Sequence, residues 1–289
     1  MSNRFLYLTT VLIWGSTWLA IEYQLGKVPP EVSIVYRYGI ASGFLFIYSF
    51  YKKLQLLFNL KYHLWFVLLG ATLFCLNYVF AYRSQIHITS ALAAIVFSTM
   101  LWLNIILSRL VFGTRAGRRV LFGALLGIIG IVIIFAPQIG EVSLSDGVLY
   151  GSLLAFAGAL VASIGNMISQ SAQKRALPVV QANAWGMLYG ALLTAIICIV
   201  RGYEFGFDTS FTYIASLAYL AVFGSVIAFG AYLTLLGRIG AHRAGYATVM
   251  FPVVALVLSI LFEGLRLDLS IVLGTMLVLL GNVLVLKER

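Results

Sequence analysis

The stretch that decides the fold is VLFGALLGIIGIVIIFA, residues 120–136. It holds no charged side chain, and its apolar residues do not alternate with polar ones as they do in the strands of a membrane barrel. About 20 helical residues cross a hydrocarbon core about 30 Å thick, so a run of this kind is typical of a membrane-spanning helix. Arg118 and Arg119 stand directly before it, where such a helix would meet water.

The rest of the chain has the same character. Of its 289 residues, 62% are apolar and 10% are charged, and the mean hydropathy is +1.02. Soluble proteins are on average about half apolar and about a quarter charged. A soluble fold of this length cannot enclose so many apolar side chains without leaving an extensive apolar exterior. The composition excludes a soluble globular enzyme, a disordered chain and a disulfide scaffold, and it predicts an all-α integral membrane protein.

Ten stretches are long and apolar enough to form spanning helices. They are residues 4–24, 31–52, 63–84, 89–111, 119–137, 147–172, 180–201, 210–236, 241–264 and 269–287. The breaks between them are short and hold proline, glycine or charged residues. The first stretch is longer than the core of a signal peptide and no cleavage site follows it, so we expect it to be retained as the first span.

The basic residues predict the orientation. If the N-terminus is cytoplasmic, 14 of the 19 Lys and Arg residues fall on the cytoplasmic side, 4 fall on the other side, and Arg37 lies inside the second span. Cytoplasmic loops of membrane proteins collect Lys and Arg. We therefore expect both chain ends to be cytoplasmic (N-in/C-in), which requires an even number of spans. The same bias accounts for the net charge of +10, so we expect no nucleic-acid partner.

The two halves of the chain resemble each other at an offset near 150. Four residues of one span recur 151 positions later: Gly123, Leu126, Gly130 and Val132 precede Gly274, Leu277, Gly281 and Val283. We expect two repeats, residues 1–137 and 147–289, with five spans each. Because five is odd, the second repeat must enter the membrane from the opposite side. Such inverted repeats recur in secondary transporters, and duplication kept only for packing is the alternative.

Several motifs are similar to those of a known family. Trp14-Gly15-Ser16-Thr17-Trp18 lies in the first span, and Pro30 precedes Arg37 in the second. Further matches are Ala91-Leu92-Ala93-Ala94, Phe251-Pro252-Val253-Val254 with Phe262-Glu263-Gly264, and the Gly274 to Gly281 segment. Together they resemble the drug/metabolite transporter superfamily, specifically EamA-type transporters with two EamA domains. Leu101 and Thr114 depart from the pattern, because the family often has proline and glutamate there.

The resemblance implies ten helices, with spans 1–4 and 6–9 around a central cavity and spans 5 and 10 at the periphery. It also implies the movement of small organic solutes such as amino acids or metabolites, with efflux as the expected direction. We therefore expect a secondary carrier that works by alternating access in the cell inner (plasma) membrane. A membrane-embedded enzyme acting on lipid and a non-transporting structural membrane protein are the alternatives.

Arg37 is the sharpest candidate for a binding residue. A charged side chain inside a span costs several kcal/mol unless it is paired, hydrated or able to reach the interface. One interpretation is that Arg37 anchors a carboxylate or another anionic group at the outer mouth of the cavity. The other is that it extends outward to water or pairs with Glu22 near the end of the first span.

Other polar and aromatic side chains inside the spans are candidates for the cavity wall. They are Trp14, Ser16, Thr17, Asn77, Tyr78, Tyr82, Trp102, Asn166, Tyr189 and Tyr232. Hydrogen bonding between helices and, for the tyrosines, a place in the interfacial belt are the competing interpretations. If transport is coupled to an ion, Glu22 and Glu263 are the titratable candidates.

Paired glycines in several spans predict close helix contacts. Gly39 and Gly43, and Gly123 and Gly127, each follow the small-xxx-small spacing that lets helices approach closely. The second pair could alternatively support contacts in a homodimer. No nucleotide, metal or redox motif occurs in a supporting context, and Cys75 and Cys198 match no disulfide spacing, so we expect neither a metal nor another cofactor.

Overall fold

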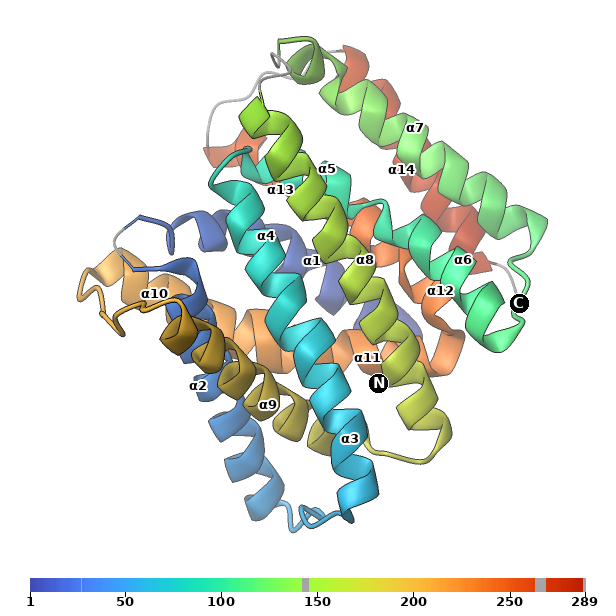
Figure 1. Ribbon diagram of the computed structural model, residues 1–289. Coiled ribbons are helices and arrows are strands. Elements are labelled where there is room, and N and C mark those ends of the chain that lie inside the picture. Colours follow the sequence, from blue (N-terminus) through green and yellow to red (C-terminus); the bar gives the residue numbers. More distant parts are fainter. Residues whose placement is uncertain (27, 142–145, 263–268, 288–289) are drawn as a thin grey trace.

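The protein is a bundle of helices (Figure 1). The computed structural model describes residues 1–26, 28–141, 146–262 and 269–287, and every regular element within these ranges is a helix. The first half holds α1 (Asn3–Glu22), α2 (Pro30–Tyr51), α3 (Leu60–Leu69), η1 (Gly70–Leu76), α4 (Asn77–Gln85), α5 (Ser90–Phe97), α6 (Met100–Phe112) and α7 (Arg118–Glu141). The second half holds α8 (Asp146–Lys174), α9 (Val179–Val200), α10 (Phe211–Tyr219), η2 (Leu220–Ile227), α11 (Ala228–Ile239), α12 (Ala241–Ala244), α13 (Tyr246–Phe262) and α14 (Leu269–Lys287).

The helical prediction is confirmed, because each of the predicted stretches is mainly helical over its described residues, with turns at some ends and short breaks in two of them. Within the ranges given above, six helical stretches are long and apolar enough to cross a membrane: Asn3–Glu22, Leu60–Gln85, Leu92–Phe112, Gly147–Lys174, Val179–Val200 and Phe211–Ile239. Leu269–Val285 is a shorter apolar helix. The chain is therefore an all-helical, multi-pass membrane protein.

Local sequence explains where several helices begin and end. The hydroxyl of Ser2 accepts the N–H of Phe5 at the start of α1, and Thr89 and Ser210 cap α5 and α10 in the same way. Pro30 opens α2, where its missing N–H has no partner to lose. Gly113 ends α6 with φ 68°, a left-handed conformation that glycine adopts without strain.

Two long helical stretches contain a π-helical segment at matching positions. η1 joins α3 to α4, and η2 joins α10 to α11. Their first residues, Gly70 and Leu220, stand 150 positions apart. Segments of π-helix are rare and occur frequently at functional sites.

Helices at matching places in the two halves pack against each other. α2 contacts α9, and α7 lies alongside α14 at one side of the bundle (Figure 1). Glycines allow the close approach of α7 and α14: a Cβ on Gly130 would stand 2.5 Å from the carbonyl oxygen of Gly274, and one on Gly123 would stand 2.6 Å from that of Gly281. Small residues at such a crossing let two backbones approach closely, which adds van der Waals contact between helices in a membrane.

The prediction of close helix contacts is wrong for Gly39 and Gly43 and is confirmed for Gly123 and Gly127. Gly39 and Gly43 are exposed, and a Cβ on either would meet no atom within 4 Å, so they form no close contact within this chain. Gly123 contacts α14, and Gly127 lies against Tyr246 of α13. The second pair is therefore used for packing inside the chain.

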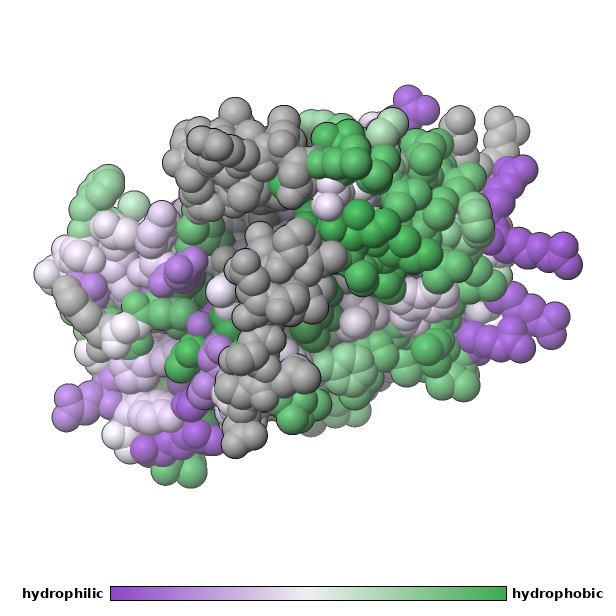
Figure 2. Space-filling view, turned by 90° about the horizontal axis from the view of Figure 1, so that it is seen from above, coloured by the Kyte–Doolittle hydropathy of each residue, from purple (hydrophilic) through white to green (hydrophobic). Residues whose placement is uncertain are grey.

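The exterior of the bundle is apolar, as a lipid environment requires. Phe50, Leu110, Ile199 and many other large apolar side chains are exposed. Figure 2 shows hydrophobic atoms over much of one face, with hydrophilic side chains gathered at its opposite ends. An exposed apolar surface of this extent is unfavourable in water and favourable in a bilayer.

Candidate functional site: a central cavity

A small cavity lies between the helices of the two halves. α1, α4, α8, α11 and α13 all contribute to its wall, together with α5 and α6. Its water-accessible volume is about 60 Å³. One water needs at least about 10–15 Å³ of such space, so the cavity holds a few waters, and an organic solute needs its side chains to move apart.

Aromatic rings form most of the wall. The Trp14 ring meets three others edge-on or tilted, with centroids 4.7 Å from Phe229, 4.9 Å from Tyr232 and 5.8 Å from Phe251. Trp18 lies edge-on to Phe97 at 5.1 Å. Such edge-to-face contacts hold aromatic rings in defined positions and still present apolar faces to a ligand.

Two amides, those of Asn77 and Asn166, contribute to the polar part of the wall. Asn166 donates to Tyr232 Oη at 3.0 Å and to Asn104 Oδ1 at 3.2 Å. Asn77 donates to the Leu73 carbonyl oxygen at 3.4 Å, and its Oδ1 has no hydrogen-bond partner among the described residues. A buried polar atom without a partner is costly, so Asn77 is available to a solute or a water in the cavity.

Arg37 lies directly behind the cavity wall and is 0% exposed. Its Nε donates to Ser225 Oγ at 2.9 Å, and its Nη1 and Nη2 make long contacts of 3.5 and 3.4 Å with the hydroxyls of Tyr82 and Tyr78. The guanidinium carbon stands 4.5 Å from the ring centroid of Tyr78, which also lines the cavity. The side chain neither reaches water nor meets Glu22, which is exposed, so both structural alternatives for Arg37 are excluded.

The charge of Arg37 has no ionic counterpart among the residues that the structure describes. Among the described residues no carboxylate lies within ion-pair distance of it, and hydroxyls and aromatic faces surround it instead. These contacts offset part of the cost of burying a cation, because aromatic faces and hydroxyl oxygens both carry partial negative charge. A guanidinium has five N–H donors, so capacity for an anionic ligand remains.

η2 shapes the surroundings of Arg37. Ser225 accepts from Arg37 and donates to the Leu220 carbonyl oxygen at 2.9 Å. One residue earlier, the Gly224 carbonyl oxygen accepts the indole N–H of Trp14 at 2.9 Å. This segment therefore connects the buried cation to the aromatic wall.

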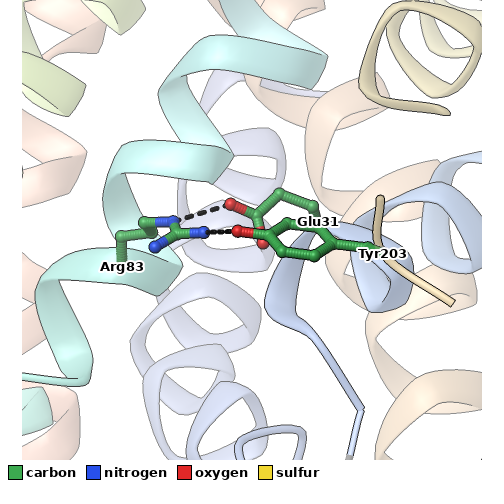
Figure 3. Close-up of polar contacts among 3 residues, drawn as sticks. All are labelled: Glu31, Arg83 and Tyr203. Atoms are coloured by element: carbon green, nitrogen blue, oxygen red, sulfur yellow. Dashed lines mark hydrogen bonds and ion pairs between the residues drawn. The ribbon is translucent and has the colours of Figure 1, made fainter. Parts of the chain in front are cut away.

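A partly buried ion pair lies nearer the end of the bundle. Glu31, at the start of α2 and 1% exposed, accepts from Arg83 Nε at 2.7 Å, and Arg83 Nη2 also donates to the hydroxyl of Tyr203 (Figure 3). Tyr203 belongs to the connection between α9 and α10. The three side chains join the start of α2, the end of α4 and this connection.

The structure brings some predicted site residues together and separates others. Six of the candidates line the cavity: Trp14, Thr17, Asn77, Tyr78, Asn166 and Tyr232. Arg37 and Tyr82 lie just behind that wall, and Tyr82 is fully buried.

Three candidates lie elsewhere. The hydroxyl of Ser16 is 2.6 Å from that of Tyr219, and Tyr189 Oη is 2.7 Å from His63 Nδ1 between α9 and α3. Trp102 is half-buried on α6 and does not reach the cavity. Of the two coupling candidates, Glu22 is exposed and Glu263 falls outside the described residues.

The sequence analysis missed several residues of the wall and its support. Phe229 precedes Tyr232 by three positions, so helical spacing could have found it. Ser225 and Gly224 gave no comparable signal, because their role depends on a contact with Arg37 across 188 positions of sequence.

Comparisons with known proteins show that this membrane-spanning fold is that of a transporter. The EamA-like transporter family matches residues 2–136 and 149–287, and the chain belongs to this family. It is 24% identical to the "Uncharacterized transporter YoaV" of Bacillus subtilis, over 95% of this chain and 93% of that protein. It is 27% identical to the "Uncharacterized inner membrane transporter YedA" of Escherichia coli, over 86% and 78% of the two chains.

Another relative has a more specific name. The "Probable amino-acid metabolite efflux pump" of Escherichia coli is 24% identical over 98% of this chain and 95% of that protein. A solved crystal structure superposes with a TM-score of 0.80, covering 100% of this chain and 99% of that one at 20% identity, which supports the fold. These relationships indicate a transporter rather than an enzyme.

Proposed function

We propose that the protein is a secondary carrier that exports small organic solutes bearing a carboxylate, by alternating access around the central cavity. Arg37 carries the proposal, since it is a fully buried cation beside the cavity without a carboxylate partner among the described residues. Burying an uncompensated charge costs several kcal/mol. A solute carboxylate that reaches the guanidinium when the Tyr78 ring moves would provide the missing counter-charge.

The rest of the wall suits the remainder of such a solute. The rings around Trp14 offer an apolar surface, and the amides of Asn77 and Asn166 offer hydrogen bonds. An amino acid or a similar metabolite has a carboxylate, an apolar part and a group that forms hydrogen bonds. The name of the Escherichia coli relative, an amino-acid metabolite efflux pump, supports both the solute class and the outward direction.

The proposed architecture is ten spans in two inverted repeats, residues 1–137 and 147–289, with both chain ends cytoplasmic. Reciprocal contacts support it. An offset of 151 maps Gly123 to Gly274 and Gly130 to Gly281, and the contact between Gly123 and Gly281 recurs as the contact between Gly274 and Gly130. A contact that exchanges its partners in this way is what a two-fold axis between the halves produces.

Inverted repeats supply the mechanism. When the two halves exchange conformations, a cavity open to one side becomes open to the other. In this conformation the cavity is narrow, and the contact of Glu31, Arg83 and Tyr203 connects elements near one end of the bundle. We place the protein in the inner (plasma) membrane, supported by the helices long enough to cross it and by the inner-membrane relative.

Transport by the purified protein in liposomes tests the proposal. Vesicles loaded with a radiolabelled amino acid or its N-acetyl derivative should exchange it, whereas the methyl ester, which lacks the negative charge, should exchange slowly. Arg37→Gln should reduce exchange about ten- to a hundredfold, the worth of a hydrogen bond to a charged group. Arg37→Lys, which keeps the charge, should retain more exchange than Arg37→Gln. Equal exchange of acids and esters by the native protein would contradict a carboxylate-binding role.

A further inference from the structure

A second pocket lies where α1 begins and α11 and α14 end. Its water-accessible volume is about 310 Å³. Asn3, Arg4 and Tyr7 of α1 line one side, and Arg243 of α12 and Asn282 of α14 are among the residues that line the others. α1 packs on α11 and α13 rather than along α14, so the pocket occupies the space between α1 and α14.

The pocket is positively charged. Arg4 and Arg243 line it, and no carboxylate is among the described residues that do. Arg238 lies beside it and donates to the Met1 carbonyl oxygen at 2.9 Å and to Asn3 Oδ1 at 3.3 Å, which adds a third cation at this place. None of the three arginines has an ion pair within the described parts of the chain.

Two buried donors in the pocket have no hydrogen-bond partner in the described parts of the chain. Tyr7 is 4% exposed, and its hydroxyl lies near the Asn282 side chain but completes no hydrogen bond of good geometry with any described residue. Arg243 Nε is likewise buried and without a described partner. Unpartnered buried donors are costly, so a group that accepts hydrogen bonds is favoured here. The combination of cations and free donors selects an anion with several oxygens.

The surface next to the pocket is apolar. Leu8 and Leu12 follow Arg4 at spacings of four along α1, and all three are exposed. On α14, Met276 and Leu280 lie within two turns of Val283, which lines the pocket, and both are exposed. A soluble anion would gain nothing from these side chains, whereas the acyl chains of a lipid would cover them.

We propose that this pocket binds the phosphate of an anionic phospholipid, with its acyl chains along Leu8 and Leu12 of α1 and Met276 and Leu280 of α14. Basic pockets between membrane helices are known sites for acidic headgroups. The bound lipid would join α1 to α14 across a gap that the protein leaves unfilled. The inference is independent of the transported solute.

Native mass spectrometry of the full chain in detergent tests this inference. The delipidated protein is titrated with phosphatidylglycerol or phosphatidylcholine, and the occupancy of the lipid adduct is measured. We expect tighter binding of phosphatidylglycerol, and we expect Arg4→Gln with Arg243→Gln to weaken it about fivefold for each arginine removed. Arg118→Gln with Arg119→Gln is the matched control, because it removes the same charge from two exposed arginines outside the pocket.

Two further measurements keep the inference falsifiable. Tyr7→Phe should weaken phosphatidylglycerol binding without loss of folding, because the hydroxyl completes no hydrogen bond of good geometry with a described residue. If Arg243→Gln does not fold, Arg4→Gln against Arg118→Gln repeats the comparison with two exposed side chains. Equal binding of the two lipids, an equal loss in the control, or displacement of the lipid by millimolar inorganic phosphate would overturn the proposal.

Discussion

Gly224 lies against the guanidinium of Arg37, and a Cβ at this glycine would stand 3.2 Å from Arg37 Nη2 and 3.0 Å from Thr17 Cγ2. The absence of a side chain is therefore what makes room for the largest fully buried side chain of the protein's described residues. The corresponding contact, between α9 and η1, has the large and the small residue exchanged: the glycine is on α9 and the large side chain is on η1. There Gly186 leaves room for the ring of Phe74, since a Cβ at Gly186 would stand 3.0 Å from Phe74 Cε2.

Gly224→Ala should impair transport more than stability. The added methyl displaces Arg37 or Thr17 by a few tenths of an ångström, and alanine favours the helix by up to about 1 kcal/mol relative to glycine. We expect a severalfold rise in the KM for a carboxylated solute and a melting temperature close to that of the native protein. Gly230→Ala in α11 is the control, since its Cβ would meet no atom within 4 Å. A similar KM for the two variants would show that Arg37 tolerates the methyl group.

Glu31→Gln should loosen the end of the bundle where Arg83 and Tyr203 meet. The ion pair of Glu31 and Arg83 is only partly buried, so its worth lies between that of an exposed pair and that of a fully buried pair. We expect a loss of about 1–3 kcal/mol in the free energy of unfolding. Glu204→Gln, an exposed acid next to Tyr203, should cost much less. Thermal unfolding in detergent compares the two variants.

The same substitution can be followed through a native cysteine. Cys198 is buried in a cluster with Val32, the residue after Glu31. In a Cys75→Ala background, Glu31→Gln should raise the rate of Cys198 labelling by a small maleimide severalfold. An unchanged rate would mean that the ion pair does not control opening at this end.

Asn166→Ala should destabilise the bundle by about 1 kcal/mol, because hydrogen bonds between membrane helices are worth about 0.6 kcal/mol each on average and Asn166 makes two to oxygen acceptors, besides a weaker one to the Met100 sulfur. Tyr232→Phe should cost about half as much. The double variant should cost less than the sum, since one bond is shared. Chemical unfolding of all three variants measures this coupling, and strictly additive losses would contradict the shared bond.

Gly130→Ala should destabilise the contact between α7 and α14. Its Cβ would stand 2.5 Å from the Gly274 carbonyl oxygen, which is backbone and cannot move without shifting the helix. We expect a melting temperature several degrees lower, whereas Gly39→Ala should have no such effect, because its Cβ would face open space. Equal melting temperatures would show that the two helices separate at little cost.

The sequence predicts the helices well and their faces only partly. Runs such as residues 120–136 are helical because a membrane leaves only helices and closed barrels, and these runs lack the alternation of a barrel strand, so composition and pattern identify them. A polar side chain inside a span is also easy to find. Which neighbour it meets is harder, since Arg37 depends on Ser225, 188 positions away, and Tyr189 meets His63 rather than the cavity.

The sequence did not predict which glycine makes room for a large side chain, nor which charged residues near the helix ends form a pair. Nothing local distinguishes Gly224, which makes room for Arg37, from Gly39, which contacts nothing nearby. Glu31 and Arg83 lie near the ends of predicted spans, where charges are ordinary, and only the fold shows that they meet. Helix identity is a local property, whereas the site depends on how distant helices are rotated.

The π-helical turns of η2 determine which way the side chains of α11 face. An α-helix rotates about 100° per residue, so one residue more or less in this segment would swing Phe229 and Tyr232 away from the aromatic wall. Insertions and deletions that a connecting loop would absorb are therefore disallowed here. The length of this segment is as much a part of the site as any side chain in it.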